Sequence, residues 1–412
     1  MNKSPLLTFQ QAKELILTTG NAFNYDQYKT VSLMESIDCY LAETIYSPLS
    51  IPSFNNSAMD GYVVRQQDIE NFSTLPIAGS IFAGDNDEIT WPKGSCLRIM
   101  TGAYVPQDAY AVIMQEKVTI QNNCITFDQQ QIKKGQNIRY IGESINKGDK
   151  VLTRGERLTI GKLATLATLG IEQVKIYKPI KVALFSTGNE LTSIGEDLKS
   201  NNHIYDSNRF TLHLMLKTLG CEVIDLGIIK DDLTLIKQTL QKASEEADLV
   251  ITSGGVSVGD ADYVKQALEQ LGHINFWKIA IKPGKPFAFG RLGQALFCGL
   301  PGNPVSSLVT FYQLVQPLIL TMFSQKIAAD SLTFKVKTTS NLTKTPGRLD
   351  FQRGYLYSNK NGELVVTSTG QQGSHITSSF DRANCFILLE KDRGDVLAGE
   401  WVIVEPFNKI LS

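Results

Sequence analysis

The chain has 412 residues, of which 42% are hydrophobic, so it is long enough for roughly two to four domains with real cores. Forty lysines and arginines against 41 aspartates and glutamates give a net charge of −1, which provides no electrostatic basis for binding nucleic acid or a membrane surface. No apolar run reaches about 18 residues, so no transmembrane helix is expected, and the N-terminus lacks the apolar core of a signal peptide. The six cysteines and four histidines show neither CxxC nor metal-ligand spacing. We therefore expect a reduced, cytoplasmic, soluble enzyme without a Cys/His zinc site.

The first half of the chain changes character twice. Residues 8–45 look helical, since apolar residues recur at helical spacing and the stretch Ser32–Glu43 continues the pattern. Residues 46–140 are rich in proline, glycine and short alternating runs, which is typical of strands and turns. Residues 141–177 turn helical again, with a short helix ending at Gly170. We predict a helical domain from residues 1–46 and 141–178, with a β domain of residues 47–140 inserted into it.

The second half alternates between strands and helices before it returns to strands. From residue 179 to about residue 327, apolar runs alternate with helical faces that stop at Gly220 and Gly272. This alternation predicts a doubly wound, parallel α/β domain. Residues 328–412 read as strands, with Asn361-Gly362 as a hairpin turn, and predict a small β-barrel or sandwich.

The most informative stretch runs from Thr252 to Asp262 and directly follows an apolar run that ends at Ile251. Open α/β sheets bind ligands at the carboxyl ends of their strands, where glycines let N–H groups approach an anion. Asp260 and Asp262 suit a cation such as Mg²⁺. The glycine spacing matches neither G-x-x-x-x-G-K-[ST] nor G-x-G-x-x-G, so this is a phosphate-type loop of a different kind.

A second polar strand end lies at Ser186–Leu191, and it is expected at the same sheet edge as the glycine loop. Asp231 and Asp232 follow the next strand, where they either cap a helix or face the pocket. The residues Asp206–Asn208 open the intervening helix. A capping role is favoured for them, because Asp and Ser are preferred N-caps.

Three lysines and a glycine-proline loop follow in the α/β region. If residues 277–282 are extended, Lys278 and Lys282 share one face of the strand, and Lys285 lies in the next turn. Such a face either binds phosphates or guards an edge strand. The loop at residues 299–307 either offers N–H groups and hydroxyls at a helix start or is only a rigid connector.

Two further polar motifs fall in the predicted β domain. Asp60 lies in the turn-forming stretch Asn55–Tyr62, and Thr101 follows a strand within Arg98–Ala103. Taken alone, each motif is better explained as an ordinary turn or β-bulge.

Together these motifs resemble the molybdopterin molybdenumtransferases, the molybdenum insertases of molybdenum cofactor biosynthesis, a family that includes the C-terminal region of gephyrin. The resemblance covers essentially the whole chain and rests on six segments in the family's order. These are residues 57–62, 99–103, 186–191, 252–263, 278–287 and 300–305. Residues 345–354 and 373–375 look like the bacterial branch.

The resemblance implies four domains, an elongated homodimer with clefts built by both subunits, and Mg²⁺ as cofactor. The implied reaction takes adenylylated molybdopterin and molybdate, cleaves the phosphoanhydride, inserts molybdenum into the dithiolene and releases AMP. Further implied partners are the molybdopterin adenylyltransferase and the molybdoenzymes that receive the product.

The resemblance also implies roles for individual residues, carried over position by position. The implied catalytic residues are Asp60, Thr101, Glu190, Asp262, Lys278 and Lys282, and the implied metal ligands are Glu190, Asp231 and Asp262. The implied substrate-binding residues are Ser186, Thr187, Gly188, Ser253, Gly254, Gly255, Val256, Ser257, Lys285, Pro301, Gly302, Asn303, Pro304, Arg353 and Ser374.

Two positions depart from the family pattern. Ser144 stands where relatives commonly carry an aspartate, and Asn189 stands where an aspartate often precedes Glu190. Two other functions stay open at this point. An adenylyltransferase would not need residues 1–178 and 331–412, and a non-catalytic scaffold would not need the acids and lysines.

Overall fold

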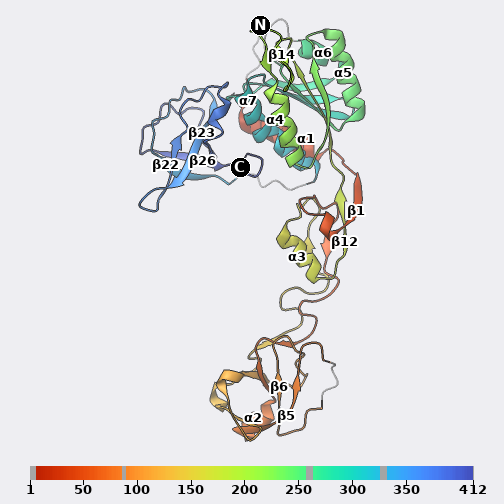
Figure 1. The fold of residues 1–412 in the computed structure, drawn as a ribbon, viewed down its shortest axis with the longest axis vertical. Helices are drawn as coiled ribbons and strands as arrows, with labels where there is room; N and C mark the ends of the chain where they lie inside the picture. The colour runs from red at the N-terminus through yellow and green to blue at the C-terminus, as the bar shows by residue number, and fades with distance from the viewer. Residues whose placement is uncertain (1–5, 86–89, 257–262, 325–331, 412) are drawn as a thin grey trace.

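The computed structural model describes residues 6–85, 90–256, 263–324 and 332–411. The molecule is elongated, with the strands β5 and β6 at one end and the α/β region at the other (Figure 1). Three six-stranded sheets and several short two-stranded pairings make up its β structure in the described part of the chain. The fold is thus multidomain, with α/β and β regions as predicted, while the exact domain boundaries stay a prediction.

The α/β region is built on a sheet with the strand order β16-β13-β17-β21-β20-β18. The first four strands are parallel, whereas β20 pairs antiparallel with both β21 and β18. The antiparallel edge was not part of the prediction. The strands are β13 (Lys181–Thr187), β16 (Glu222–Ile229), β17 (Leu249–Ser253), β18 (His273–Lys278), β20 (Pro286–Leu292) and β21 (Ala295–Leu300).

Helices cover both faces of this sheet, as a doubly wound fold requires. Alternate residues of β13 divide between two apolar layers, because side chains of a strand point to opposite faces. Val182 and Leu184 pack in the layer of α4, whereas Ala183 and Phe185 pack in the layer of α5 and α6. The helices are α4 (Ser207–Thr218), α5 (Leu233–Glu246), α6 (Tyr263–Leu271), α7 (Pro304–Thr310) and α8 (Gln316–Met322).

The helices α7 and α8 are joined by a π-helical turn, Phe311–Val315, into one apolar helix. In the described part of the chain this is the one helix long and apolar enough to cross a membrane, but 83% of its most apolar window is buried inside the structure. The helix α1 (Phe9–Asn21) packs against it so closely that a Cβ on Gly20 would lie 2.1 Å from Thr321 Oγ1. This helix is therefore part of the core. The search of the sequence for long apolar runs did not find it, because serines, threonines and glutamines interrupt its apolar residues.

The region predicted to be helical is mixed. The stretch Ser32–Glu43 is not a helix, because the chain here forms β1 (Tyr28–Ser32), a 3-10 turn and then β2 (Ile45–Tyr46). Pairing of β1 with β12 (Gln173–Tyr177) supplies partners that local helical spacing does not reveal. The second segment contributes the predicted short helix α3 (Ile160–Thr168) and the strand β11 (Lys150–Leu152). A separate apolar cluster, which includes Leu41, Leu158 and Leu166, forms the core of this part.

The inserted region is built on a half-barrel sheet with the order β7-β4-β6-β5-β9-β8. Its apolar side chains form two clusters of their own, around Tyr62 and around Val63. The elements are β3 (Asn56–Ser57), β4 (Gly61–Val64), α2 (Gln66–Asn71), β5 (Thr74–Ile81), β6 (Cys96–Ile99), β7 (Ala111–Met114), β8 (Thr119–Gln121), β9 (Cys124–Thr126) and β10 (Ile138–Arg139).

The C-terminal region is a closed five-stranded barrel, because β23 pairs with both β24 and β25. The predicted hairpin turn at Asn361-Gly362 lies between β23 and β24. A short strand of the α/β region, β19 (Ile281–Lys282), adds to the barrel beside β23. The barrel strands are β22 (Phe334–Thr338), β23 (Leu349–Ser358), β24 (Leu364–Ser368), β25 (Cys385–Leu389) and β26 (Trp401–Pro406).

Candidate active site

A cavity of about 790 Å³ lies at the carboxyl ends of β13, β17 and β21. This is where a doubly wound sheet binds its ligands. The structure brings together most of the strand-end residues singled out in the sequence. Those that line the cavity are Thr187, Gly188, Glu190, Asp231, Ser253, Gly254, Gly255, Val256, Pro301, Gly302, Asn303 and Pro304.

Three carboxylates line this cavity, and Glu190 and Asp231 are the two that are not engaged in capping α4 as Asp206 is. The loop that carries Glu190 is braced to Asp231 by a reciprocal pair of hydrogen bonds, both 3.2 Å long. The Asn189 N–H donates to Asp231 Oδ2, and the Asp231 N–H donates to Asn189 Oδ1. Gly188 has φ +152°, and a Cβ there would lie 2.7 Å from Glu190 Oε2, so glycine gives the carboxylate its room. Asn189 therefore connects the loops of both acids.

The glycine pair after β17 forms the second wall of the cavity. Gly254 and Gly255 have φ +88° and +66°, and a Cβ on Gly255 would lie 2.8 Å from Thr187 Oγ1. Successive backbone N–H groups in such a conformation form a concave site for anions. The Thr187 hydroxyl is buried and has no hydrogen-bond partner among the described residues. The Gly254 N–H already donates to the Leu300 carbonyl at 3.1 Å, so the unpartnered Thr187 hydroxyl is the donor that remains for an oxyanion.

The third wall is the loop Pro301–Pro304, which leads into α7. Asn303 and Pro304 open the helix, and the Ser307 N–H donates to the Asn303 carbonyl at 2.9 Å. The Val305 N–H donates to the Ser374 carbonyl at 3.1 Å, which ties the C-terminal region to this helix start. Ser374 was predicted to bind substrate, but it is not among the cavity-lining residues. In the structure its carbonyl holds the loop.

Arg353 was also predicted to bind substrate, but only 1% of it is exposed. Its Nε donates to Ser379 Oγ at 3.0 Å and its Nη2 to the Gly373 carbonyl at 3.2 Å. Burial lowers the pKa of Arg353 to about 10, against the opposing effect of Asp350. The arginine thus anchors the loop that leads to His375.

Eight residues that line the cavity were not among the predicted site residues: Leu191, Ile204, Tyr205, Asp206, Ser207, Asn208, Pro286 and His375. His375 is exposed and lines the cavity from the C-terminal region, and it is the last residue of the segment 373–375 that was noted as a motif without a site role for the histidine. Tyr205, on β15 (Ile204–Tyr205), lines it from the other side with 46% of its surface exposed. Membership of that motif could have indicated His375, whereas the short pairing of β15 with β14 (Leu191–Thr192) gave no local signal for Tyr205.

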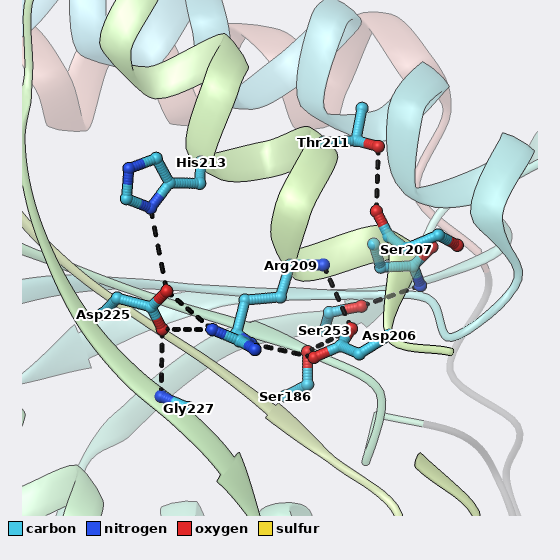
Figure 2. A network of polar contacts seen from close by, with 10 residues as sticks. Ser186, Asp206, Ser207, Arg209, Thr211, His213, Asp225, Gly227 and Ser253 are labelled. Atoms are coloured by element: carbon cyan, nitrogen blue, oxygen red, sulfur yellow. Dashed lines mark hydrogen bonds and ion pairs between the residues drawn. The ribbon is translucent and has the colours of Figure 1, made fainter. Parts of the chain in front are cut away.

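Beside the cavity lies a charged network that fixes the start of α4. Figure 2 shows Arg209 between Asp206 and Asp225, with Ser186 and Ser253 close to Asp206. Asp206 caps α4 by accepting the Arg209 N–H at 3.2 Å, as the sequence favoured. It also accepts from the buried Ser186 hydroxyl at 3.1 Å. Ser186 is therefore a support of the pocket in this structure rather than part of its lining.

The Arg209 guanidinium closes this network. It donates to Asp206 Oδ2 at 2.9 Å and to Asp225 Oδ2 at 2.6 Å. Burial opposes the charge of Arg209, but the hydrogen bonds to Asp225 and Asp206 outweigh it and raise the pKa of the guanidinium above its ordinary value. The side chain is therefore a permanent cation between two acids.

The three lysines lie outside the residues that line the cavity, and the prediction that Lys278 and Lys282 share one strand face is wrong. The strand β18 ends at Lys278, and the Ala280 N–H then donates to the Leu7 carbonyl, which takes the chain out of the sheet. Lys282 instead belongs to β19, where its Nζ lies 3.2 Å from Asp350 Oδ2 of the barrel. Lys278 and Lys285 are exposed.

Asp60 and Thr101 lie together in the inserted β region. The Thr101 N–H and hydroxyl both donate to Asp60 Oδ1, at 2.8 and 2.7 Å. These donors lower the pKa of the Asp60 carboxyl below its ordinary value, since they stabilise the ionised form. Figure 1 places their sheet, which contains β6, at the opposite end of the molecule from β14. Within one chain the pair therefore does not reach the cavity.

Two predicted site residues, Ser257 and Asp262, lie outside the described residues. Within the described ranges, no group of three or more His, Cys, Asp or Glu side chains is arranged to hold a metal ion. Of the three predicted metal ligands, Glu190 and Asp231 are described by the structure, and both line the cavity.

Comparison with known proteins covers the whole architecture. Residues 7–170 match the MoeA N-terminal region (domain I and II), residues 183–321 a probable molybdopterin binding domain, and residues 335–407 the MoeA C-terminal region (domain IV). A molybdopterin molybdenumtransferase of Haemophilus influenzae is 52% identical over 408 residues, covering 99% of this chain and 100% of that protein. Gephyrin of Dictyostelium discoideum is 31% identical, covering 97% of this chain and 62% of that protein.

A solved structure supports the same assignment. The molybdopterin biosynthesis moeA protein of Pyrococcus horikoshii superposes with a TM-score of 0.84 at 27% identity, covering 98% of this chain and 100% of that one. Sequence and fold therefore agree over nearly the full length, and the chain belongs to the MoeA family.

Proposed function

We propose that this chain takes molybdenum from molybdate and inserts it into adenylylated molybdopterin, with cleavage of the phosphoanhydride and release of AMP. By its family the chain is a molybdopterin molybdenumtransferase, an enzyme that inserts molybdenum during molybdenum cofactor biosynthesis. The proposal adds the adenylylated substrate, the bond that breaks and the residues that act.

One observation supports the proposal most directly. A single cavity combines the carboxylates of Glu190 and Asp231 with the glycine pair at residues 254–255 and the unpartnered hydroxyl of Thr187. A glycine-lined wall that lets a ligand approach closely and a free hydroxyl suit phosphate and molybdate, which are both oxyanions. Carboxylates in the same cavity would repel these anions unless a cation lies between them.

The donor set fits Mg²⁺. This ion takes one or two carboxylates and fills its remaining positions with water and substrate phosphate oxygens, and Glu190 and Asp231 supply two carboxylates. When bound, Mg²⁺ would neutralise charge on the phosphoanhydride. The Asn189–Asp231 pair of hydrogen bonds would keep both acid-bearing loops at a fixed separation.

The protein's own part in the reaction is binding and charge stabilisation. The glycine loop and the Thr187 hydroxyl hold the phosphates. Lys278 and Lys282 are proposed to neutralise charge while the anhydride is cleaved, which requires that the substrate extends beyond the cavity, because both lysines lie outside its lining. The cavity contains no Cys or Lys among its described lining residues, and no serine or threonine hydroxyl there is hydrogen-bonded to a histidine. We therefore assign the attack on phosphorus to an oxygen of molybdate or water, with AMP as the leaving group.

The active enzyme is proposed to be a homodimer. Asp60 and Thr101 lie in the sheet at the far end of the elongated chain from the cavity (Figure 1). A second subunit, related by a two-fold axis, would bring its inserted β region to the cavity of the first. Light scattering that gives the mass of a single chain at micromolar concentration would contradict this arrangement.

An assay of AMP release from adenylylated molybdopterin tests the function. The proposal predicts release that needs molybdate and yields molybdenum cofactor. Formation of adenylylated molybdopterin from ATP would instead identify an adenylyltransferase, and the absence of both reactions a scaffold. We further propose a cytoplasmic location and hand-over from an adenylyltransferase to recipient molybdoenzymes.

A further inference from the structure

We infer that Asn208 is a positioning residue of the active site, which fixes the two loops that carry its backbone donors. Its Nδ2 atom donates to Ser253 Oγ at 2.9 Å and to the Gly302 carbonyl at 2.7 Å. A side-chain amide has two N–H donors, so both bonds form at the same time. One side chain on the first turn of α4 thus connects the end of β17 with the loop that precedes α7.

The loop after β17 and the loop before α7 lie next to each other. Ser253 comes directly before the glycine pair, and the Gly254 N–H donates to the Leu300 carbonyl at 3.1 Å. A Cβ on Gly302 would lie 3.9 Å from the Gly254 Cα, in ordinary van der Waals contact, so the two loops are close neighbours beyond that hydrogen bond. Asn208 holds both loops from the side of the helix. Without it, the loops are free to shift relative to each other.

The first turn of α4 is itself firmly placed, which makes it a suitable anchor. Asp206 caps the helix and accepts from Ser186 at the end of β13, while Arg209 pairs with Asp225 of β16. Figure 2 shows these residues gathered at the start of the helix. The turn is therefore bonded to β13 through Asp206, to β16 through Arg209, and to β17 and the loop after β21 through Asn208.

The sequence indicated only a capping segment at Asp206–Asn208. The cap is made by Asp206, and Asn208 serves the loops instead. This inference rests on the proposed function, because the loops matter through the anion that they bind. A displacement of about 1 Å at such donors is sufficient to weaken binding and slow turnover strongly.

The test replaces Asn208 in the full-length protein by Leu, which has a similar shape but no donor, and by Ala. Thr218→Ala is the matched control, since it removes one hydrogen bond to the Leu214 carbonyl at the other end of the same helix. Calorimetry measures the affinity for AMP, and amide hydrogen exchange measures how firmly residues 253–256 and 299–303 are held.

We expect both Asn208 variants to bind AMP about tenfold more weakly, since two hydrogen bonds of the pocket are lost. Exchange should become faster in the two loops and stay unchanged in α5. Thr218→Ala should match the parent in both measurements, and the melting temperatures of all variants should lie within a few degrees of one another.

A double variant tests whether Asn208 and Ser253 act together. If Asn208 acts through Ser253, the double variant Asn208→Ala/Ser253→Ala should lose less affinity than the sum of the single losses. Parent-like affinity and parent-like exchange in Asn208→Leu and Asn208→Ala would overturn the inference. A parent protein that does not bind AMP would overturn the proposed function, while the exchange data would still decide whether Asn208 holds the loops.

Discussion

The two polar sites of this chain differ in how they are built. The cavity gathers side chains from the ends of three parallel strands, and its acid-bearing loops are braced by Asn189 and Asp231. The inserted β region contributes a pair in which the exposed Thr101 donates twice to the half-buried Asp60. The first is a preformed pocket, because sheet topology places its parts together. In the dimer that we propose, the second is one wall of a site that the cavity of the other subunit completes.

The largest expected effect concerns the acids of the cavity. Glu190→Gln and Asp231→Asn keep the shape of the side chain and remove its charge, so AMP release should fall by at least about a hundredfold. Asp232→Asn is the matched control. The neighbouring Asp232 caps α5 by accepting the Leu235 N–H at 2.8 Å, and asparagine caps equally well. A comparable loss in the control, or melting temperatures that fall in step with activity, would mean that these acids only stabilise the fold.

A smaller effect is expected at the lysines. Each charge-assisted contact contributes about 1.5–3 kcal/mol, so Lys278→Ala and Lys282→Ala should each weaken binding of the anionic substrate roughly ten- to hundredfold. The loss should be largest at low salt. Lys335→Ala, which removes an exposed lysine from β22, serves as control. Parent-like binding by both variants would show that these lysines are solvated and that the phosphate site lies elsewhere.

At the pair of Asp60 and Thr101 the expected effect is a change in the pKa of the Asp60 carboxyl. Thr101→Val removes the hydroxyl donor and keeps the N–H donor, so the pKa of Asp60 should rise part of the way to its ordinary value. The pKa of Asp60 is lower in the folded protein because folding stabilises its ionised form. This stabilisation of the fold is therefore fully present above the ordinary Asp pKa and is lost as the pH falls through the lowered pKa of the folded state. Carboxyl NMR titration of the two proteins measures the shift. An unchanged pKa would mean that the N–H alone holds the carboxylate.

The smallest effect is expected at Ser144. This residue is exposed, and its N–H donates to the Ile51 carbonyl at 2.9 Å, so its backbone rather than its hydroxyl holds the loop. Ser144→Ala should turn over at nearly the parent rate. A fall beyond about tenfold would reveal a specific role for the hydroxyl.

Much of the cavity could be predicted from the sequence, because the cavity residues directly follow strands. The end of a strand can be recognised from the neighbouring sequence alone. Thr187 to Glu190, Asp231 and the glycine pair all came from that pattern. The same logic predicted the cap at Asp206. It did not reveal that Asp206 also bonds to Ser186, or that Asn208 reaches Gly302, because those partners are distant in the chain.

The wrong predictions have the same origin. Ser32–Glu43 looked helical from its spacing, but β1 is stabilised by β12, which lies far along the chain. Lys278 and Lys282 looked like one strand face, but contact with Leu7 takes the chain out of the sheet between them. His375 enters the cavity from another region altogether. Local patterns indicate elements and their polar ends, whereas long-range pairing decides which ends meet.

Mixed dimers test the central claim, that each active site joins the cavity of one subunit to the Asp60–Thr101 pair of the other. Two differently tagged chains, one with Asp60→Asn and one with Glu190→Gln, are produced together, and the heterodimer is purified through both tags. A shared site places both substitutions in one active site and neither in the other, so AMP release should recover to about half of the parent rate. A heterodimer as inactive as the two homodimers would show that each chain uses its own Asp60 and would contradict the account.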